Sequence, residues 1–156
     1  MLKKNIIILY ISILIFFLDR ISKYYILNLS GLENTLNIPI TSFLNFNLVF
    51  NKGIAFGFLS VDETFYYNII TLIIILITLI VLIMAFKTSG VEKLGFSMIF
   101  GGSLGNIFDR LYYSAVVDFI DININNIHWF IFNFADIFIT IGVLVLVLFE
   151  VFKKKI

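Results

Sequence analysis

Acidic side chains are the ionisable groups that recur in this sequence where chemistry could take place. The chain has no cysteine and a single histidine, which argues against a thiolate nucleophile and against a sulfur- or histidine-built metal site. Asp118 follows one long apolar run and Asp136 lies within another. Two carboxylates that share a site hold one proton near neutral pH, so one can activate a water while the other protonates a carbonyl. The residues favour an aspartic hydrolase, and two unrelated acids, each with its own cation or reaching to water, stay open as the alternative.

The composition predicts that these acids lie among membrane-spanning helices. Of the 156 residues, 61% are hydrophobic and only 13% are charged, whereas soluble domains carry about 25% charged residues. A soluble domain of this composition would expose large apolar patches and aggregate, and the chain is too apolar to be disordered. Its net charge of +1 gives no basic surface for nucleic acid. A crossing takes about 20 apolar residues. The runs predict transmembrane helices in a single membrane domain, 1–156, at about residues 5–29, 65–86, 94–113 and 130–150.

The basic residues predict the orientation of these helices. Seven lysines lie at the termini and in the loop at 87–93, against four basic residues on the other side, so we expect cytoplasmic termini. Apolar and polar residues alternate between Ile40 and Asn51, which predicts a strand in an extracytoplasmic β region at about 31–62. A second outer loop is expected at about 114–129. The predicted fold class is mainly α: an integral membrane four-helix bundle with a small extracytoplasmic β-sheet and a short outer helix or loop.

The expected topology brings the two acids together. Asp118 comes shortly after the third span, and Asp136 lies roughly two turns into the fourth. Because these spans are antiparallel and joined outside, both carboxylates should lie at a similar depth, just below the outer surface.

Other polar residues have competing interpretations. Asp19 and Lys23 share a helix face and favour a structural ion pair over a catalytic role. Gly101 and Gly105 also share a face, which favours close helix packing. His128 with Trp129 is typical of an interfacial aromatic belt, and a metal or general-base role for the histidine is disfavoured.

Asn106 and Arg110 share a third helix face. They could hydrogen-bond an extended peptide or simply hold a loop in place, and both interpretations stay open.

Five short motifs follow one another along nearly the whole chain. They are Asp19-Arg20-Ile21-Ser22-Lys23, Asn51-Lys52-Gly53-Ile54-Ala55-Phe56-Gly57, Gly101-Gly102-Ser103-Leu104-Gly105-Asn106-Ile107-Phe108-Asp109-Arg110, Val116-Val117-Asp118-Phe119 and Phe132-Asn133-Phe134-Ala135-Asp136. In this order, on a four-helix hydropathy profile, the chain resembles the lipoprotein signal peptidases (signal peptidase II), the membrane aspartyl peptidases of bacterial lipoprotein maturation. Ser103 and Ile54 are small departures from the usual pattern and affect no carboxylate.

The resemblance implies roles for particular residues. Asp118 and Asp136 would be the catalytic dyad. The residues that line the substrate groove or support the dyad would be Asn51, Gly53, Asn106, Arg110 and Asn133. Those that stabilise the site would be Asp19, Lys23 and Asp109.

The resemblance also implies a substrate and a location. The substrate would be a diacylglyceryl-modified prolipoprotein, cut on the N-terminal side of its lipidated cysteine in the bacterial cytoplasmic membrane. Membrane lipid would be a partner, and a monomer without metal or organic cofactor is expected. A small transporter or proton-relay protein, which would use the same intramembrane acids, is the main alternative, and a non-catalytic membrane adaptor is another.

Overall fold

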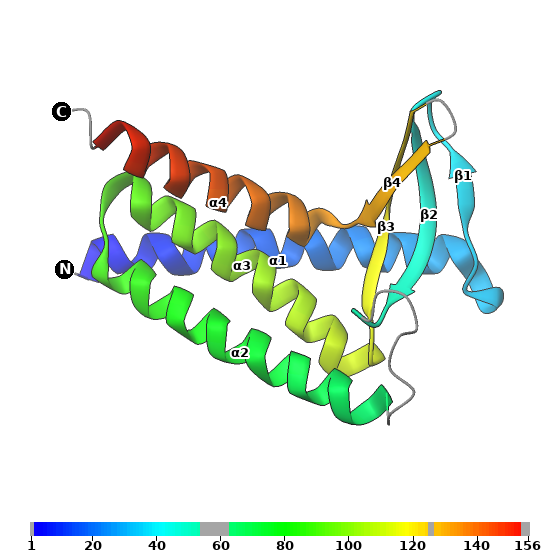
Figure 1. Cartoon of the computed structure of the whole chain (residues 1–156), viewed down its shortest axis with the longest axis horizontal. Coiled ribbons are helices and arrows are strands. Elements are labelled where there is room, and N and C mark those ends of the chain that lie inside the picture. The colour runs from blue at the N-terminus through cyan, green and yellow to red at the C-terminus, as the bar shows by residue number, and fades with distance from the viewer. Residues whose placement is uncertain (1, 54–62, 125–126, 154–156) are drawn as a thin grey trace.

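Four long helices form the body of the part of the chain that the structure describes, which is residues 2–53, 63–124 and 127–153 of a computed structural model. They are α1 (Leu2–Ser30), α2 (Glu63–Lys87), α3 (Gly90–Tyr113) and α4 (Phe134–Lys153). The start of α1 and the end of α4 lie at one end of the molecule, and a small sheet covers the other (Figure 1). The segment from Ile54 to Gly57 and the side chains of His128 and Trp129 lie outside the described residues.

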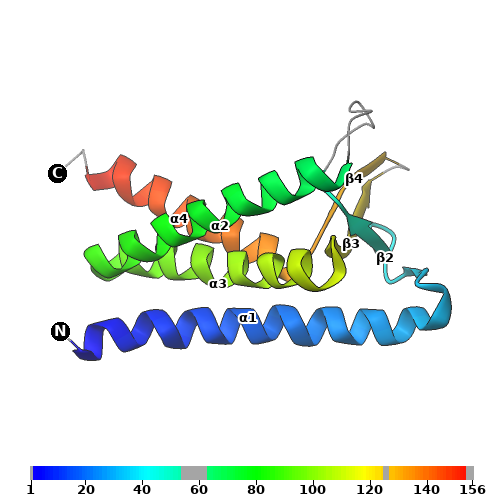
Figure 2. The same ribbon diagram turned by 90° about the horizontal axis from the view of Figure 1, so that it is seen from below.

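Helix α3 lies in the middle of the bundle and packs against each of the other three helices (Figure 2). Its glycines allow the close approach to α1. A Cβ atom at Gly101 would lie 2.8 Å from the Cα atom of Ser12, and one at Gly105 would lie 2.5 Å from a carboxylate oxygen of Asp19. The predicted packing role of this glycine face is therefore confirmed.

The bundle is apolar outside and polar inside. Leu76 and Ile80 of α2 and Leu144 of α4 are all more than half exposed, whereas Asp19 and Lys23 are at most 1% exposed. The helices Thr64–Lys87 and Phe134–Lys153 are long and apolar enough to cross a membrane. An apolar exterior around paired polar groups is the arrangement that hydrocarbon surroundings require.

A four-stranded antiparallel sheet positions the rest of the site. Its strands, in spatial order, are β1 (Asn37–Pro39), β2 (Leu44–Asn51), β3 (Val116–Ile124) and β4 (Ile127–Phe132), and a single 3-10 turn, Gly31–Glu33, leads into it from α1. The sheet packs Leu48, Val117 and Phe119 against Ile26 of α1. This apolar core fixes the sheet on the end of the first helix.

Two predicted boundaries are wrong. The segment at 114–129 is not a loop, because it contains all of β3 and the first half of β4. Strand β3 is buried from Val116 to Asp121, so it lacks the alternation that would mark a half-exposed strand. The last helix begins at Phe134 rather than at about 130, because residues 130–132 belong to β4 and Asn133 caps the helix.

Candidate active site

The two candidate catalytic acids come from different kinds of element. Asp118 lies on β3 opposite Val49 of β2, and Asp136 lies in the first turn of α4. Both line one cavity of about 270 Å³. Asn51, Asn106 and Arg110 line the same cavity, so the structure brings these predicted residues together.

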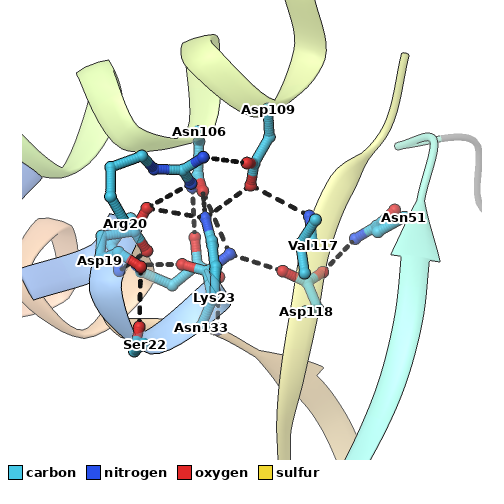
Figure 3. Close-up of polar contacts among 12 residues, drawn as sticks. Asp19, Arg20, Ser22, Lys23, Asn51, Asn106, Asp109, Val117, Asp118 and Asn133 are labelled. Atoms are coloured by element: carbon cyan, nitrogen blue, oxygen red, sulfur yellow. Dashed lines mark hydrogen bonds and ion pairs between the residues drawn. The ribbon is translucent and has the colours of Figure 1, made fainter. Parts of the chain in front are cut away.

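Asn133 connects the two acids. Its side-chain oxygen accepts a hydrogen bond from the backbone N–H of Asp136 (3.0 Å), and its own backbone N–H donates to Asp136 Oδ2 (3.1 Å). This reciprocal pair is a capping box at the start of α4. Because the oxygen of Asn133 is engaged by a donor, its Nδ2 faces the other way and donates to Asp118 Oδ1 at 2.6 Å (Figure 3).

Asn51 is oriented in the same manner. Its side-chain oxygen accepts from the backbone N–H of Gly53 at 2.7 Å, and its Nδ2 donates to Asp118 Oδ2 at 2.9 Å. Gly53 has a φ of +74°, in the left-handed region that favours glycine. The turn after β2 therefore presents the Asn51 amide to the acid on the neighbouring strand.

Asn106 holds the second acid. Lys23 Nζ donates to its side-chain oxygen at 3.0 Å, and its Nδ2 donates to Asp136 Oδ1 at 2.8 Å. A lysine ammonium is a donor only, so it fixes which end of the amide faces the carboxylate. Each asparagine that binds the dyad thus has its oxygen anchored by another donor.

A buried charge cluster lies behind the dyad. Lys23 Nζ is 2.9 Å from Asp19 and 2.7 Å from Asp109, and Arg20 bridges the same two acids at 2.7 and 2.6 Å (Figure 3). Two cations and two anions balance within the cluster. Breaking one partner of such a buried set leaves an uncompensated charge, which is strongly destabilising.

The cluster reaches the backbone beside each candidate catalytic acid. Asp19 Oδ1 accepts the N–H of Ala135, which precedes Asp136, and Asp109 Oδ2 accepts the N–H of Val117, which precedes Asp118, both at 3.1 Å. The three residues expected to stabilise the site therefore lie where they can set the position of both carboxylates.

Asp118 has an unusual protonation equilibrium. Its pKa is raised from 3.8 to about 6, and burial is the largest cause. The charge of Asp136 raises this pKa as well, while the amides of Asn51 and Asn133 and the charge of Lys23 lower it. A carboxyl group with this pKa exchanges its proton near neutral pH, as acid–base catalysis requires.

Arg110 lines the cavity and contacts Tyr67, a residue that the sequence did not single out. Its guanidinium lies over the ring of Tyr67, with Cζ 5.3 Å from the ring centroid, and the Tyr67 hydroxyl donates to the Arg110 backbone carbonyl at 3.1 Å. Tyr67 belongs to no motif and lies in an apolar helix, so the sequence offered no signal for it.

In the described part of the chain, no group of three or more His, Cys, Asp or Glu residues could hold a metal ion.

Comparisons with known proteins identify the class first. The fold is that of bacterial membrane enzymes. One such enzyme, solved by the in meso method at 2.3 Å resolution, has a TM-score of 0.72 and 29% identity over 94% of this chain and 88% of its own. A second, solved at 1.9 Å, has a TM-score of 0.71 and 32% identity over 90% of each chain.

The family follows from the sequence relatives. The family described as Signal peptidase (SPase) II matches residues 11–152, and the chain belongs to this family. The lipoprotein signal peptidase of Pelagibacter ubique (strain HTCC1062) is 48% identical over 92% of this chain and 87% of the relative. The lipoprotein signal peptidase of Francisella tularensis subsp. novicida (strain U112) is 42% identical over 93% of this chain and 91% of the relative. These findings support a peptidase and give no support to the transport alternative.

Proposed function

We propose that the chain is an aspartic endopeptidase that removes the signal peptide from diacylglyceryl-modified prolipoproteins, cutting on the N-terminal side of the lipidated cysteine. The observation that carries this proposal is the pair of carboxylates, Asp118 and Asp136, which line one cavity and are joined through Asn133. The names of the relatives support the choice of substrate.

The mechanism follows from one proton shared by the dyad. One carboxylate removes a proton from a water whose oxygen attacks the scissile carbonyl carbon, and the protonated acid donates its proton to the carbonyl oxygen. When the tetrahedral intermediate collapses, the C–N bond breaks and the proton taken from water passes to the amine of the lipidated cysteine. One hydroxyl proton of the intermediate returns to the other carboxylate, which leaves a carboxyl product and restores the singly protonated dyad. The amides of Asn51, Asn106 and Asn133 keep both carboxylates in place during these transfers.

The peptide part of the substrate would bind through polar groups of the same cavity. An extended segment inside a membrane needs partners for its backbone groups. Arg110 Nη1 is buried and has no hydrogen-bond partner among the described residues, so it is available to a peptide carbonyl. Arg110 is therefore assigned to substrate binding rather than to holding a loop.

The lipid part would lie on the other side of Asp136. A second cavity of about 310 Å³ is lined by that residue and by the apolar side chains Phe130, Phe132, Ile137 and Ile141. Because the two cavities share Asp136, acyl chains here would lie beside the peptide bond to be cut. Apolar contact along an acyl chain adds about 0.8 kcal/mol for each buried CH₂ group.

The proposal includes the membrane topology. All four helices cross the cytoplasmic membrane with both termini in the cytoplasm, and the sheet and the dyad lie near the outer face. The enzyme acts as a monomer, without metal or organic cofactor, on substrates that arrive in the plane of the bilayer.

The test is cleavage of a diacylglyceryl-modified precursor by the purified protein in lipid vesicles, followed by gel mobility. The wild type should release the signal peptide, and Asp118→Asn or Asp136→Asn should slow cleavage by at least about a hundredfold, because each removes one member of the acid–base pair. Glu92→Gln is the matched control and should cleave normally, because Glu92 lies in the first turn of α3, at the end of that helix far from the cavity residues Asn106 and Arg110. Normal processing by either folded dyad variant would overturn the mechanism.

A further inference from the structure

Tyr67 contacts Arg110 in two ways, although it does not line the dyad cavity itself. The residue lies in the second turn of α2 and is buried. Its hydroxyl donates to the Arg110 carbonyl at 3.1 Å, one of the last four carbonyls of α3, which have no partner within their helix. Its ring lies 5.3 Å from the guanidinium carbon of the same residue. Backbone and side chain of Arg110 are therefore both held by one tyrosine.

Gly53 also lies close to the guanidinium. A Cβ atom at this position would lie 2.9 Å from Arg110 Nη2, so the glycine leaves just enough space for the arginine. Arg110 therefore contacts both this turn and the Tyr67 ring, and it is only 9% exposed. It nevertheless keeps one donor, Nη1, without a partner among the described residues.

We infer that Tyr67 is a positioning residue for substrate binding: it fixes the Arg110 guanidinium so that the free Nη1 donor is ready for a carbonyl oxygen of the extended peptide. The inference rests on the proposed function, which supplies the peptide. A cation over an aromatic ring is bound more strongly where water is excluded, and a side chain already fixed loses less entropy when substrate binds. Loss of the ring should therefore weaken binding rather than slow the chemical step.

The experiment measures KM and kcat for the lipid-modified precursor with Tyr67→Leu, Tyr67→Phe, Arg110→Ala and the double variant Tyr67→Leu/Arg110→Ala. Tyr67→Leu should raise KM about five- to tenfold and change kcat less than about twofold. Tyr67→Phe keeps the ring and should raise KM less. In the Arg110→Ala background, Tyr67→Leu should add no further rise, because a positioning residue has no effect once its target is gone.

Tyr66→Leu is the matched control. Tyr66 is the next residue of α2, about 100° around the helix, and its ring contacts Phe65 at 5.9 Å between centroids. Its loss should leave KM unchanged. Thermal unfolding of every variant separates positioning from stability, and if Tyr67→Leu does not fold, the same double-variant comparison is made with Tyr67→Phe.

The outcomes distinguish this inference from the proposed function. A wild-type protein that leaves the precursor intact contradicts the proposed function. Cleavage by the wild type with an unchanged KM in Tyr67→Leu contradicts the positioning role alone. Independent, multiplicative effects of the two substitutions on KM would also overturn it, because Tyr67 would then act without Arg110.

Discussion

Among the residues that the structure describes, each carboxylate oxygen of Asp118 and Asp136 accepts one hydrogen bond from an amide N–H. Asn51 and Asn133 supply those of Asp118, and Asn106 and the backbone of Asn133 supply those of Asp136. A carboxylate oxygen has two lone pairs, so each keeps one for water or substrate. At the scale of the residue, the site combines fixed geometry with remaining hydrogen-bonding capacity.

The raised pKa of Asp118 predicts a pH-dependent stability. The folded-state pKa of about 6 exceeds the ordinary 3.8, so the stabilising contribution of this group is complete below about pH 4 and is lost as the pH rises through 6. Asp118→Asn stays neutral and should therefore be more stable than the wild type above pH 6, by about 2 kcal/mol once the loss of one amide bond is included.

Thermal unfolding in detergent at pH 5 and pH 8 measures this effect. The Tm advantage of Asp118→Asn should be larger at pH 8, while cleavage is lost at both values. A Tm difference that does not change with pH would contradict the assignment of the raised pKa to this residue.

At the scale of the element, α3 supplies Asn106, Asp109 and Arg110 to the site, and its glycine face lets α1 approach. The two glycines on this face meet different atoms, which makes them a matched pair. Gly101→Ala would crowd the backbone of Ser12, whereas Gly105→Ala would crowd the carboxylate of Asp19, which binds the backbone beside Asp136.

Both glycine substitutions should lower stability by about 1–3 kcal/mol, because each overpacks a tight helix contact. Cleavage measured well below the Tm should fall only for Gly105→Ala, because only this change displaces Asp19. Equal activity in the two variants would show that Asp19 does not control the dyad.

The elements also show what the sequence could and could not predict. The helices at 65–86 and 94–113 were recognisable from apolar runs, and Asp118 and Asp136 from short motifs around them. The hairpin of β3 and β4 could not be predicted, because a strand buried on both faces has no alternating pattern of apolar and polar residues. Tyr67 could not be recognised as part of the site either, because its partner Arg110 is 43 residues away and no local spacing connects the two residues.

At the scale of the whole molecule, the sheet lies at one end, and the start of α1 and the end of α4 lie at the other (Figure 1). The proposed topology makes a direct prediction because the chain has no native cysteine. A single cysteine at the exposed positions Leu32 or Thr41 should react with a membrane-impermeant thiol reagent in intact cells.

A cysteine at exposed Ser89, between α2 and α3, is the matched control. It should react only after the membrane is permeabilised, because the proposed topology puts that loop on the cytoplasmic side. Labelling of Ser89→Cys in intact cells, with Leu32→Cys protected, would invert the topology and place the dyad near the inner face.

Asn133 lies between β4 and α4, caps the helix and binds both acids. The residue that sets where α4 starts is therefore also the residue that connects the two candidate catalytic acids. Inserting a single residue between β4 and α4 would rotate Asp136 away while leaving the helix intact. The first turn of α4 must therefore stay in register with β4 if Asp136 is to remain beside Asp118.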